Sequence, residues 1–223
     1  MKNLTGAAAS FDVTDQNRVK QIRDRGHYDH ETVFDILDRG LVAHVAFVDD
    51  GRPVVMPMAY GRKGDRIFIH GAKKSRIAKT MASSYVSIGV TLVDGLVVGR
   101  SIFESSMNYR AVVIHGQART LTDPDERLEA LRCVSEHNLP GRWDEVRPPL
   151  VRELAQTGVL EVQIETASAK IRNGPPIDDY EDYDHQTWVG IVPVVLCVGR
   201  PIRDSNVAAD VKEPASVSMI RKG

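Results

Sequence analysis

The alternation of apolar and polar positions predicts a chain built mainly from short β-strands joined by tight turns. In Val86–Leu92, for example, every second residue is apolar, which is the period of a strand with one buried face. Asp49-Asp50-Gly51 and Asp94-Gly95 have the composition of tight turns. We therefore expect a strand to end at Asp94-Gly95 and Leu96–Ser101 to continue the sheet. The predicted strands are Leu41–Val48, Val54–Tyr60, Arg66–Ile69, Val86–Leu92, Tyr109–Leu121 and Val159–Ala167.

The strand predicted at Val54–Tyr60 differs from the others because it is apolar throughout. This pattern is typical of a strand that is covered on both faces. Pro57 lies inside it, and proline cannot donate a hydrogen bond to a neighbouring strand. The proline therefore indicates a sheet edge, a bulge, or a position where something other than a strand lies alongside.

Helical periodicity appears in segments that lie between the predicted strands. Asp29 is a plausible N-cap for a helix over His30–Arg39, and Gly40 follows the end of that helix. Asp123-Pro124 starts a second helix that reaches about His137. Shorter helical segments are predicted over Ser75–Ser83 and Val151–Gln156.

About six strands with inserted helices predict a mainly β protein with peripheral helices (α+β), built as a closed or nearly closed antiparallel barrel. A doubly wound sheet is the second choice, because strands and helices do not alternate regularly. We expect residues 1–17 to be a flexible N-terminal segment, residues 18–200 to form one domain and residues 201–223 to form a C-terminal tail.

Composition narrows the classes of function. The chain has 223 residues, with 42% hydrophobic and 26% charged residues and a formal net charge of −1, so no global field attracts nucleic acid or an anionic membrane. The two cysteines are far apart, and no apolar run approaches the roughly 20 residues of a membrane span. The N-terminus lacks the apolar core of a signal peptide. We expect a cytoplasmic protein without nucleic-acid or membrane partners.

A basic segment follows the strand at Arg66–Ile69 and opens the predicted helix. Its residues are Gly71, Ala72, Lys73, Lys74, Ser75 and Arg76. Free backbone N–H groups at a helix start bind anions, and lysine, arginine and serine side chains add hydrogen bonds to phosphate. The alternative is a solvated helix start, although cations are unfavourable there without an anion between them. No third ligand accompanies His27 and His30, so no metal site is predicted.

The chain resembles the FMN-binding split-barrel proteins, also called pyridoxamine 5′-phosphate oxidase-like proteins. The branch it resembles is the flavin-nucleotide-binding group related to nitroimidazole-resistance (Nim) proteins. The resemblance covers roughly residues 18–200 and lies in the order and spacing of its segments. It is carried by Val54–Tyr60, Arg66–Arg76, Asp94–Arg100 and Ser106–Gly116. It implies a split antiparallel β-barrel that binds FMN and forms a homodimer with flavin sites at the interface.

The resemblance also implies a set of cofactor-binding residues: Met56, Pro57, Met58, His70, Gly71, Ala72, Lys73, Lys74, Ser75, Arg76, Asn108, Tyr109, Arg110 and Trp188. The basic segment would hold the FMN phosphate, and Met56–Met58 would lie against the isoalloxazine, although core packing explains this strand equally well. Asn108–Arg110 would contribute to the partner's flavin. His70 is the candidate catalytic residue, with a structural histidine as the alternative, and Trp188 is either a flavin contact or an interface residue.

Two functions follow from the resemblance. The first is an FMN-dependent oxidoreductase that passes electrons or hydride to a small organic acceptor, such as a nitroaromatic compound. The alternative is a non-catalytic flavin- or haem-binding protein that serves as a sensor or store. The C-terminal arginine and histidine with which pyridoxamine phosphate oxidases hold their substrate are missing, which argues against vitamin B6 oxidation.

Overall fold

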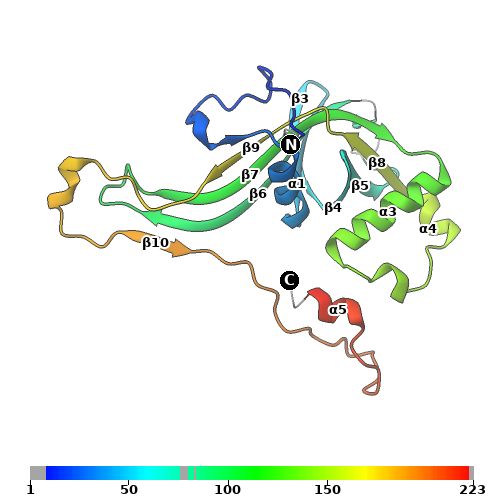
Figure 1. Cartoon of the computed structure of the whole chain (residues 1–223). Helices are drawn as coiled ribbons and strands as arrows, with labels where there is room; N and C mark the ends of the chain where they lie inside the picture. Colours follow the sequence, from blue (N-terminus) through cyan, green and yellow to red (C-terminus); the bar gives the residue numbers. More distant parts are fainter. Residues whose placement is uncertain (1–8, 76–79, 83, 221–223) are drawn as a thin grey trace, which may run out of the picture. The chain divides into compact units, whose positions relative to one another are not determined.

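The computed structural model describes residues 9–75, 80–82 and 84–220 (Figure 1). Antiparallel strands dominate, and the helices are short. The strands are β1 (Gly26–His27), β2 (Ala43–Asp49), β3 (Arg52–Met58), β4 (Tyr60–Lys63), β5 (Arg66–Ala72), β6 (Tyr85–Val98), β7 (Ser106–Thr120), β8 (Thr157–Gln163), β9 (Thr166–Arg172) and β10 (Gly190–Pro193). The helices are η1 (Arg23–Arg25), α1 (His30–Arg39), α3 (Pro124–Asn138), η2 (Trp143–Glu145), α4 (Val151–Gln156), η3 (Tyr180–Asp184) and α5 (Ala215–Ile220).

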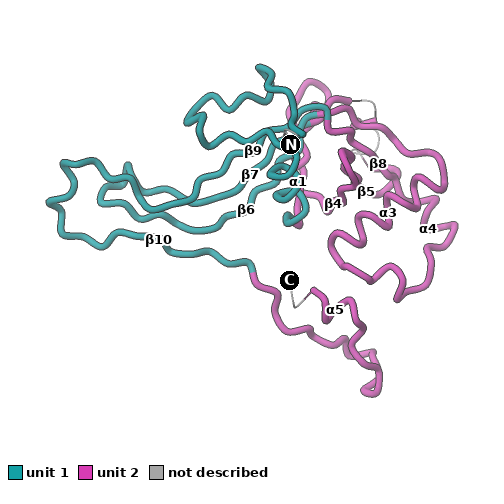
Figure 2. The backbone as a smooth tube through the Cα atoms, viewed as in Figure 1, with its two compact units in different colours: residues 1–40, 87–115, 165–196 teal, residues 41–86, 116–164, 197–223 magenta. Residues whose placement is uncertain are grey.

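The chain divides into two compact units, coloured separately in Figure 2. Unit 1 comprises residues 1–40, 87–115 and 165–196. Unit 2 comprises residues 41–86, 116–164 and 197–223. Each unit is therefore assembled from three separate stretches of the sequence.

Unit 1 is built on long antiparallel strands. β7 pairs with β9 from Tyr109↔Arg172 to His115↔Thr166, and β6 neighbours β7. β10 pairs with the end of β6, and β1 pairs with β9. Helix α1 begins and ends where the sequence predicts. The side chain of Asp29 accepts a hydrogen bond from the Thr32 backbone N–H at 2.7 Å, which satisfies an otherwise unpaired donor of the first turn.

Part of the N-terminal segment that was predicted to be flexible has fixed contacts in unit 1. Ser10 forms a bridge with Asp29. The buried Asn17 side chain donates to the carbonyl oxygens of Asp12 and Ala167, at 2.8 and 3.1 Å. These bonds tie the segment to β9.

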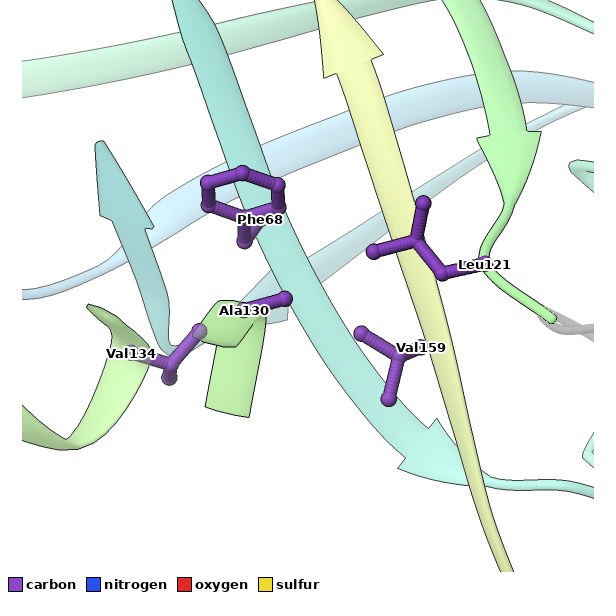
Figure 3. Close-up of a cluster of buried hydrophobic side chains, with 5 residues drawn as sticks. All are labelled: Phe68, Leu121, Ala130, Val134 and Val159. Atoms are coloured by element: carbon purple, nitrogen blue, oxygen red, sulfur yellow. The ribbon is translucent and has the colours of Figure 1, made fainter. Parts of the chain in front are cut away.

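Unit 2 contains the β2–β3 hairpin and the pairings of β8 with β7, of β8 with β5, and of β5 with β4. The predicted Asp-Gly turn of the hairpin is confirmed, because Asp50 and Gly51 have φ of 49° and 72°. Helix α3 lies beside β4 and β5 (Figure 1). The apolar residues packed between this helix and the strands are Phe68, Leu121, Ala130, Val134 and Val159 (Figure 3).

Gly61 explains how closely α3 approaches β4. A Cβ atom on this residue would lie 2.6 Å from the carbonyl carbon and oxygen of Cys133. Backbone atoms cannot yield as a flexible side chain does, so the helix rests directly on the strand at a residue without a side chain. This contact fixes the position of α3, whose far end forms part of a cavity described below.

The predicted turn at Asp94-Gly95 is wrong, because β6 runs through it without interruption to Val98. Asp94 pairs with Arg110 on the neighbouring strand. Gly95 lies opposite Pro193 of β10, and a Cβ there would meet Ile191 at 3.0 Å. A glycine that allows close approach of another strand was thus mistaken for a turn glycine.

Two predicted strands also differ from the structure. The strand predicted at Val54–Tyr60 is divided into β3 and β4 at Ala59. It is not covered on both faces within the chain, since Val55 is 61% exposed. The strand predicted at Val159–Ala167 is two strands, β8 and β9, which separate at Ile164-Glu165. The helix predicted over Ser75–Ser83 falls largely on residues 76–79 and 83, outside the described residues.

Candidate functional site

The basic segment of unit 2 begins with the last two residues of β5, Gly71 and Ala72, and continues into the turn after this strand. Gly71 pairs with Gly158 of β8, and the Lys73 N–H donates to the Gln156 carbonyl at 2.8 Å. The Ser75 N–H donates to the Ala72 carbonyl at 2.8 Å, which closes a turn. Lys73 and Lys74 are exposed, and neither forms an ion pair within the described ranges. Two unpaired cations on a fixed turn suit an anion such as phosphate. Arg76 lies outside the described residues.

His70 is the last residue of β5 before this segment and lines a cavity of about 410 Å³ within unit 2. The cavity is mainly apolar. The other lining residues come from the link between β3 and β4, from α3, from the connection between α3 and α4, and from the start of β8: Ala59, Leu131, Val134, Ser135, Asn138, Leu139, Trp143, Pro149 and Thr157. A cavity of this size and character is typical of a small-molecule or cofactor site.

His70 is exposed, although neighbouring atoms still lower its pKa below the ordinary value. The cause is desolvation, which disfavours the charged imidazolium. The lowered pKa favours the neutral form of the ring. A neutral imidazole has one nitrogen lone pair available to accept a proton or to bind a metal ion.

Met56, Pro57 and Met58 lie on β3 in unit 2, opposite Val45, His44 and Ala43 of β2. Pro57 is exposed and the two methionines are half-buried. β3 is the last strand in the order of the sheet, so Pro57 lies on an edge strand, where a missing N–H costs least. These residues offer a partly exposed apolar surface, and their proposed contact with a flavin ring stays a prediction.

The remaining predicted site residues belong to unit 1. The guanidinium of Arg110 donates to both carboxylate oxygens of Asp94, at 3.0 and 2.8 Å. These hydrogen bonds raise the pKa of Arg110. Asn108 is buried; its side-chain amide donates to the Gly174 carbonyl at 3.1 Å, and its side-chain oxygen accepts from the Arg172 guanidinium. The structure therefore gives both residues structural partners, and a contact with a flavin stays a prediction.

Trp188 and Tyr109 complete the predicted set. Trp188 is 64% exposed, and its ring lies over Gly190, where a Cβ would be 3.1 Å from the indole. Tyr109 lies opposite Arg172 and is the first residue of β7 that pairs with β9. A large exposed tryptophan is compatible with the interface role considered above.

Sequence reasoning missed most of the cavity around His70. Its wall depends on Glu136, whose carboxylate accepts hydrogen bonds from the backbone N–H groups of Gly141 and Trp143, at 2.7 and 3.2 Å. A glutamate that holds a turn several residues later leaves no periodic signal. The glycine of that turn, Gly141 with φ of 79°, is the one sequence sign of a fixed structure after α3.

A serine–histidine pair in unit 1 was also missed. Ser87 Oγ and His115 Nδ1 are 2.7 Å apart on neighbouring strands, and burial lowers the pKa of His115. The described residues show no carboxylate bonded to this imidazole. The pair is therefore a cross-strand contact. Likewise, the described residues contain no cluster of three metal-ligating side chains and no helix long and apolar enough to span a membrane.

Comparison with known proteins agrees with this architecture. A family model described as pyridoxamine 5′-phosphate oxidase matches residues 29–171. The flavocytochrome Anf3 from Azotobacter vinelandii is 35% identical, with 92% of this chain and 96% of that chain covered and a TM-score of 0.87. An FAD and haem binding protein from Mycobacterium smegmatis is also 35% identical, with coverages of 88% and 97% and a TM-score of 0.85.

A more distant structure shares the fold alone. A putative 5-nitroimidazole antibiotic resistance protein from Bacteroides thetaiotaomicron is 18% identical over 64% of this chain and 84% of its own, with a TM-score of 0.52. No match is found among curated proteins. The antiparallel strands, the peripheral helices and these similarities confirm the predicted split-barrel fold. The chain belongs to the pyridoxamine 5′-phosphate oxidase-like family.

Proposed function

We propose that this protein is a flavin-binding redox protein that also binds haem. The observation that carries the proposal is the 35% identity, over about nine-tenths of this chain, to a flavocytochrome and to an FAD and haem binding protein. Fold alone does not establish function, but the family-model match over residues 29–171 includes the segments that form the candidate site. When bound, a flavin supplies hydride and one-electron chemistry, and haem supplies one-electron chemistry.

The basic segment fits the phosphate end of a flavin. Lys73 and Lys74 are exposed cations without ion-pair partners among the described residues, and the Ser75 hydroxyl lies on the same turn. Each lysine would donate a charge-assisted hydrogen bond to a phosphate oxygen. The expectation from sequence was FMN. One of the two 35%-identical relatives is described as binding FAD, so we favour the dinucleotide.

The cavity beside His70 fits haem. The lining residues include aliphatic side chains and Trp143, which suit a flat apolar ring, and His70 is the histidine among them. A neutral imidazole nitrogen is a common axial ligand of haem iron, and the lowered pKa of His70 favours that form. In this role His70 would bind the iron and hold the haem in place. This role would replace the catalytic role that was considered for His70 from sequence.

We also propose that the protein is a homodimer, as the resemblance implies. Apolar residues on β3 and around β10 stay exposed within one chain, among them Val55, Val192 and Val195. Monomeric proteins seldom expose continuous apolar surface, and a twofold-related copy buries the same patch twice. Sedimentation of the purified protein tests this point: a mass of about 49 kDa is expected, twice the 24.7 kDa of the chain, and a stable monomer with full flavin occupancy would contradict it.

The cofactors are tested by releasing and identifying the bound chromophores. We expect one flavin, released as FAD, and one b-type haem per chain. Detection of FMN instead would correct the nucleotide but leave the flavoprotein assignment intact. A colourless protein that binds neither added flavin nor added haemin would overturn the proposal. Reduction of the bound haem by NADH or NADPH, followed by its absorbance, then separates a redox enzyme from a storage protein.

A further inference from the structure

The C-terminal segment, residues 197–220, is anchored to the rest of unit 2 by a buried serine. Nearly every residue of this segment is exposed, whereas Ser216 in α5 is only 1% exposed. Its neighbour Ser218, in the same short helix, is exposed. A polar side chain that is buried within an otherwise exposed segment needs hydrogen-bond partners at that position.

Those partners belong to Glu145, at the end of η2. The Ser216 N–H donates to Glu145 Oε1 at 2.9 Å, and the Ser216 hydroxyl donates to Oε2. Both bonds end on one ionised carboxylate, which makes them stronger than bonds between neutral groups. One turn along α5, Met219 packs over Gly141, a glycine whose Cβ position this methionine fills. The segment therefore contacts both ends of the turn Gly141–Glu145.

This turn is stiff, so a contact at one end is transmitted to the other. Glu136 holds the N–H groups of Gly141 and Trp143, at 2.7 and 3.2 Å. The Glu145 N–H donates to the Arg142 carbonyl at 3.1 Å, and the guanidinium of Arg142 donates to the carboxylate of Glu145 at 3.3 Å. Trp143 is thus only two residues away from the carboxylate that Ser216 holds.

Residues of this turn, together with Leu139 just before it, line two cavities of unit 2. One is a cavity of about 540 Å³ enclosed mainly by Pro201–Ile220, and Leu139 and Arg142 complete it. The other is the cavity of His70, where Leu139 and Trp143 form part of the lining. Leu139 lines both cavities, so the C-terminal segment packs against the same part of the chain that lines the His70 cavity.

We infer that the C-terminal segment is a strap that holds Trp143 in the wall of the His70 cavity, through the Ser216–Glu145 hydrogen bonds. Ser216 and Glu145 act as positioning residues, because neither lines the cavity. Release of the strap would free the turn Gly141–Glu145 and open that side of the cavity to solvent. The strap is a structural inference, and only its effect on haem rests on the proposed function.

The test replaces Ser216 by alanine in the full-length holoprotein and uses Ser218→Ala as the matched control. The background carries Trp188→Phe, so that Trp143 is the single tryptophan of the chain. In Ser216→Ala we expect Trp143 emission to shift to longer wavelength. We also expect the amides of Trp143 and Glu145 to exchange at least about tenfold faster, as loss of a hydrogen bond to a charged group predicts. Ser218→Ala should leave both signals unchanged.

A second variant, Glu145→Gln, removes the charge but keeps the shape, and it should change both signals in the same direction by a smaller amount. Unchanged emission and exchange in Ser216→Ala, with a native thermal transition, would overturn the strap. Equal changes in both serine variants would also overturn it. If the strap holds and haem is bound beside His70, Ser216→Ala also shifts the haem absorption band. Altered exchange without any haem band would support the strap and contradict the proposed haem site.

Discussion

Asp94 and Arg110 face each other on neighbouring strands of unit 1 and form a bidentate ion pair, with hydrogen bonds of 3.0 and 2.8 Å. Asp35 of α1 adds a second, more distant carboxylate at 3.9 Å. The sequence suggested a turn at Asp94 and a flavin contact at Arg110. The structure joins the two residues and uses them to tie β6 to β7.

This pair predicts a measurable coupling between the two residues. In a double-mutant cycle with Asp94→Asn and Arg110→Met, the free energy of unfolding should show an interaction of about 0.5–1 kcal/mol, the upper range for a partly exposed pair. Denaturant unfolding of the four proteins measures it. Arg110→Met should leave flavin affinity within about twofold if the arginine is structural. A tenfold loss of flavin would instead restore the interface role inferred from sequence.

Gly116 marks the position where β7 exchanges β9 for β8 as its partner. A Cβ on Gly116 would lie 1.8 Å from the Gln163 carbonyl oxygen, so the backbone must move to admit one. We expect Gly116→Ala to lower the free energy of unfolding by about 3 kcal/mol or more, or to prevent folding.

Gly89→Ala is the matched control, because nothing lies within 4 Å of a Cβ at that strand position. It should be neutral, or stabilise the fold by up to about 1 kcal/mol through the unfolded chain. Thermal unfolding of both variants makes the comparison. Similar destabilisation by the two substitutions would show that general strand effects, and not the approach of Gln163, explain Gly116.

Lys74→Ala removes one exposed cation from the turn after β5. If the lysine donates to a flavin phosphate, the affinity for FAD should fall by about 10- to 150-fold, equivalent to about 1.5–3 kcal/mol. Titration of the apoprotein with FAD and with riboflavin measures this effect. Riboflavin lacks the phosphate and should bind the variant and the parent protein alike. Equal losses for both ligands would show that the turn does not bind phosphate.

The strap should also respond to pH. The hydrogen bonds from Ser216 lower the pKa of Glu145 relative to the unfolded chain, with a further contribution from Arg142. A carboxyl group whose pKa is lower in the folded than in the unfolded chain stabilises the fold. This stabilisation is fully present above the unfolded pKa, about 4.3 for glutamate, and it is lost as the pH falls through the lower pKa of the folded state. We expect Trp143 emission, in a Trp188→Phe background, to be constant from pH 7 to about 5 and to shift below about pH 4.

Glu145→Gln provides the control for this titration, because it removes the group concerned but leaves the nearby carboxylate of Glu136 in place. The acid shift of Trp143 emission should disappear or shrink in that variant. An identical pH profile in the two proteins would assign the change to another group and contradict the role of Glu145.

Local signals in the sequence were sufficient for the elements with strong caps and turns. Asp29 and Gly40 mark the two ends of α1 as predicted, and Asp50-Gly51 forms the expected hairpin turn. Both features depend only on residues that are close in sequence. The family and the split-barrel fold were also predicted, from the order of several such segments. The role of Gly95 was misinterpreted because this glycine is needed for the close approach of β10, a strand about a hundred residues later in the chain.

The candidate site was predicted only in part for the same reason. His70 on β5 and the lysines of the turn after this strand are close in sequence and could be seen as a group. The remaining wall of the cavity comes from the end of α3 and from η2, and it is held by Glu136 and supported through Glu145. Contacts between residues some 70 positions apart leave no pattern in a single sequence.

The central claim is that one chain binds a flavin and holds haem through His70. Its most direct test is the absorption spectrum of purified His70→Ala beside that of the parent protein, with His44→Ala, an exposed histidine outside the cavity, as the control. We predict that the parent protein and His44→Ala show both a haem Soret band and the flavin bands, whereas His70→Ala loses the Soret band and keeps the flavin. A Soret band of unchanged position and intensity in His70→Ala would contradict the account.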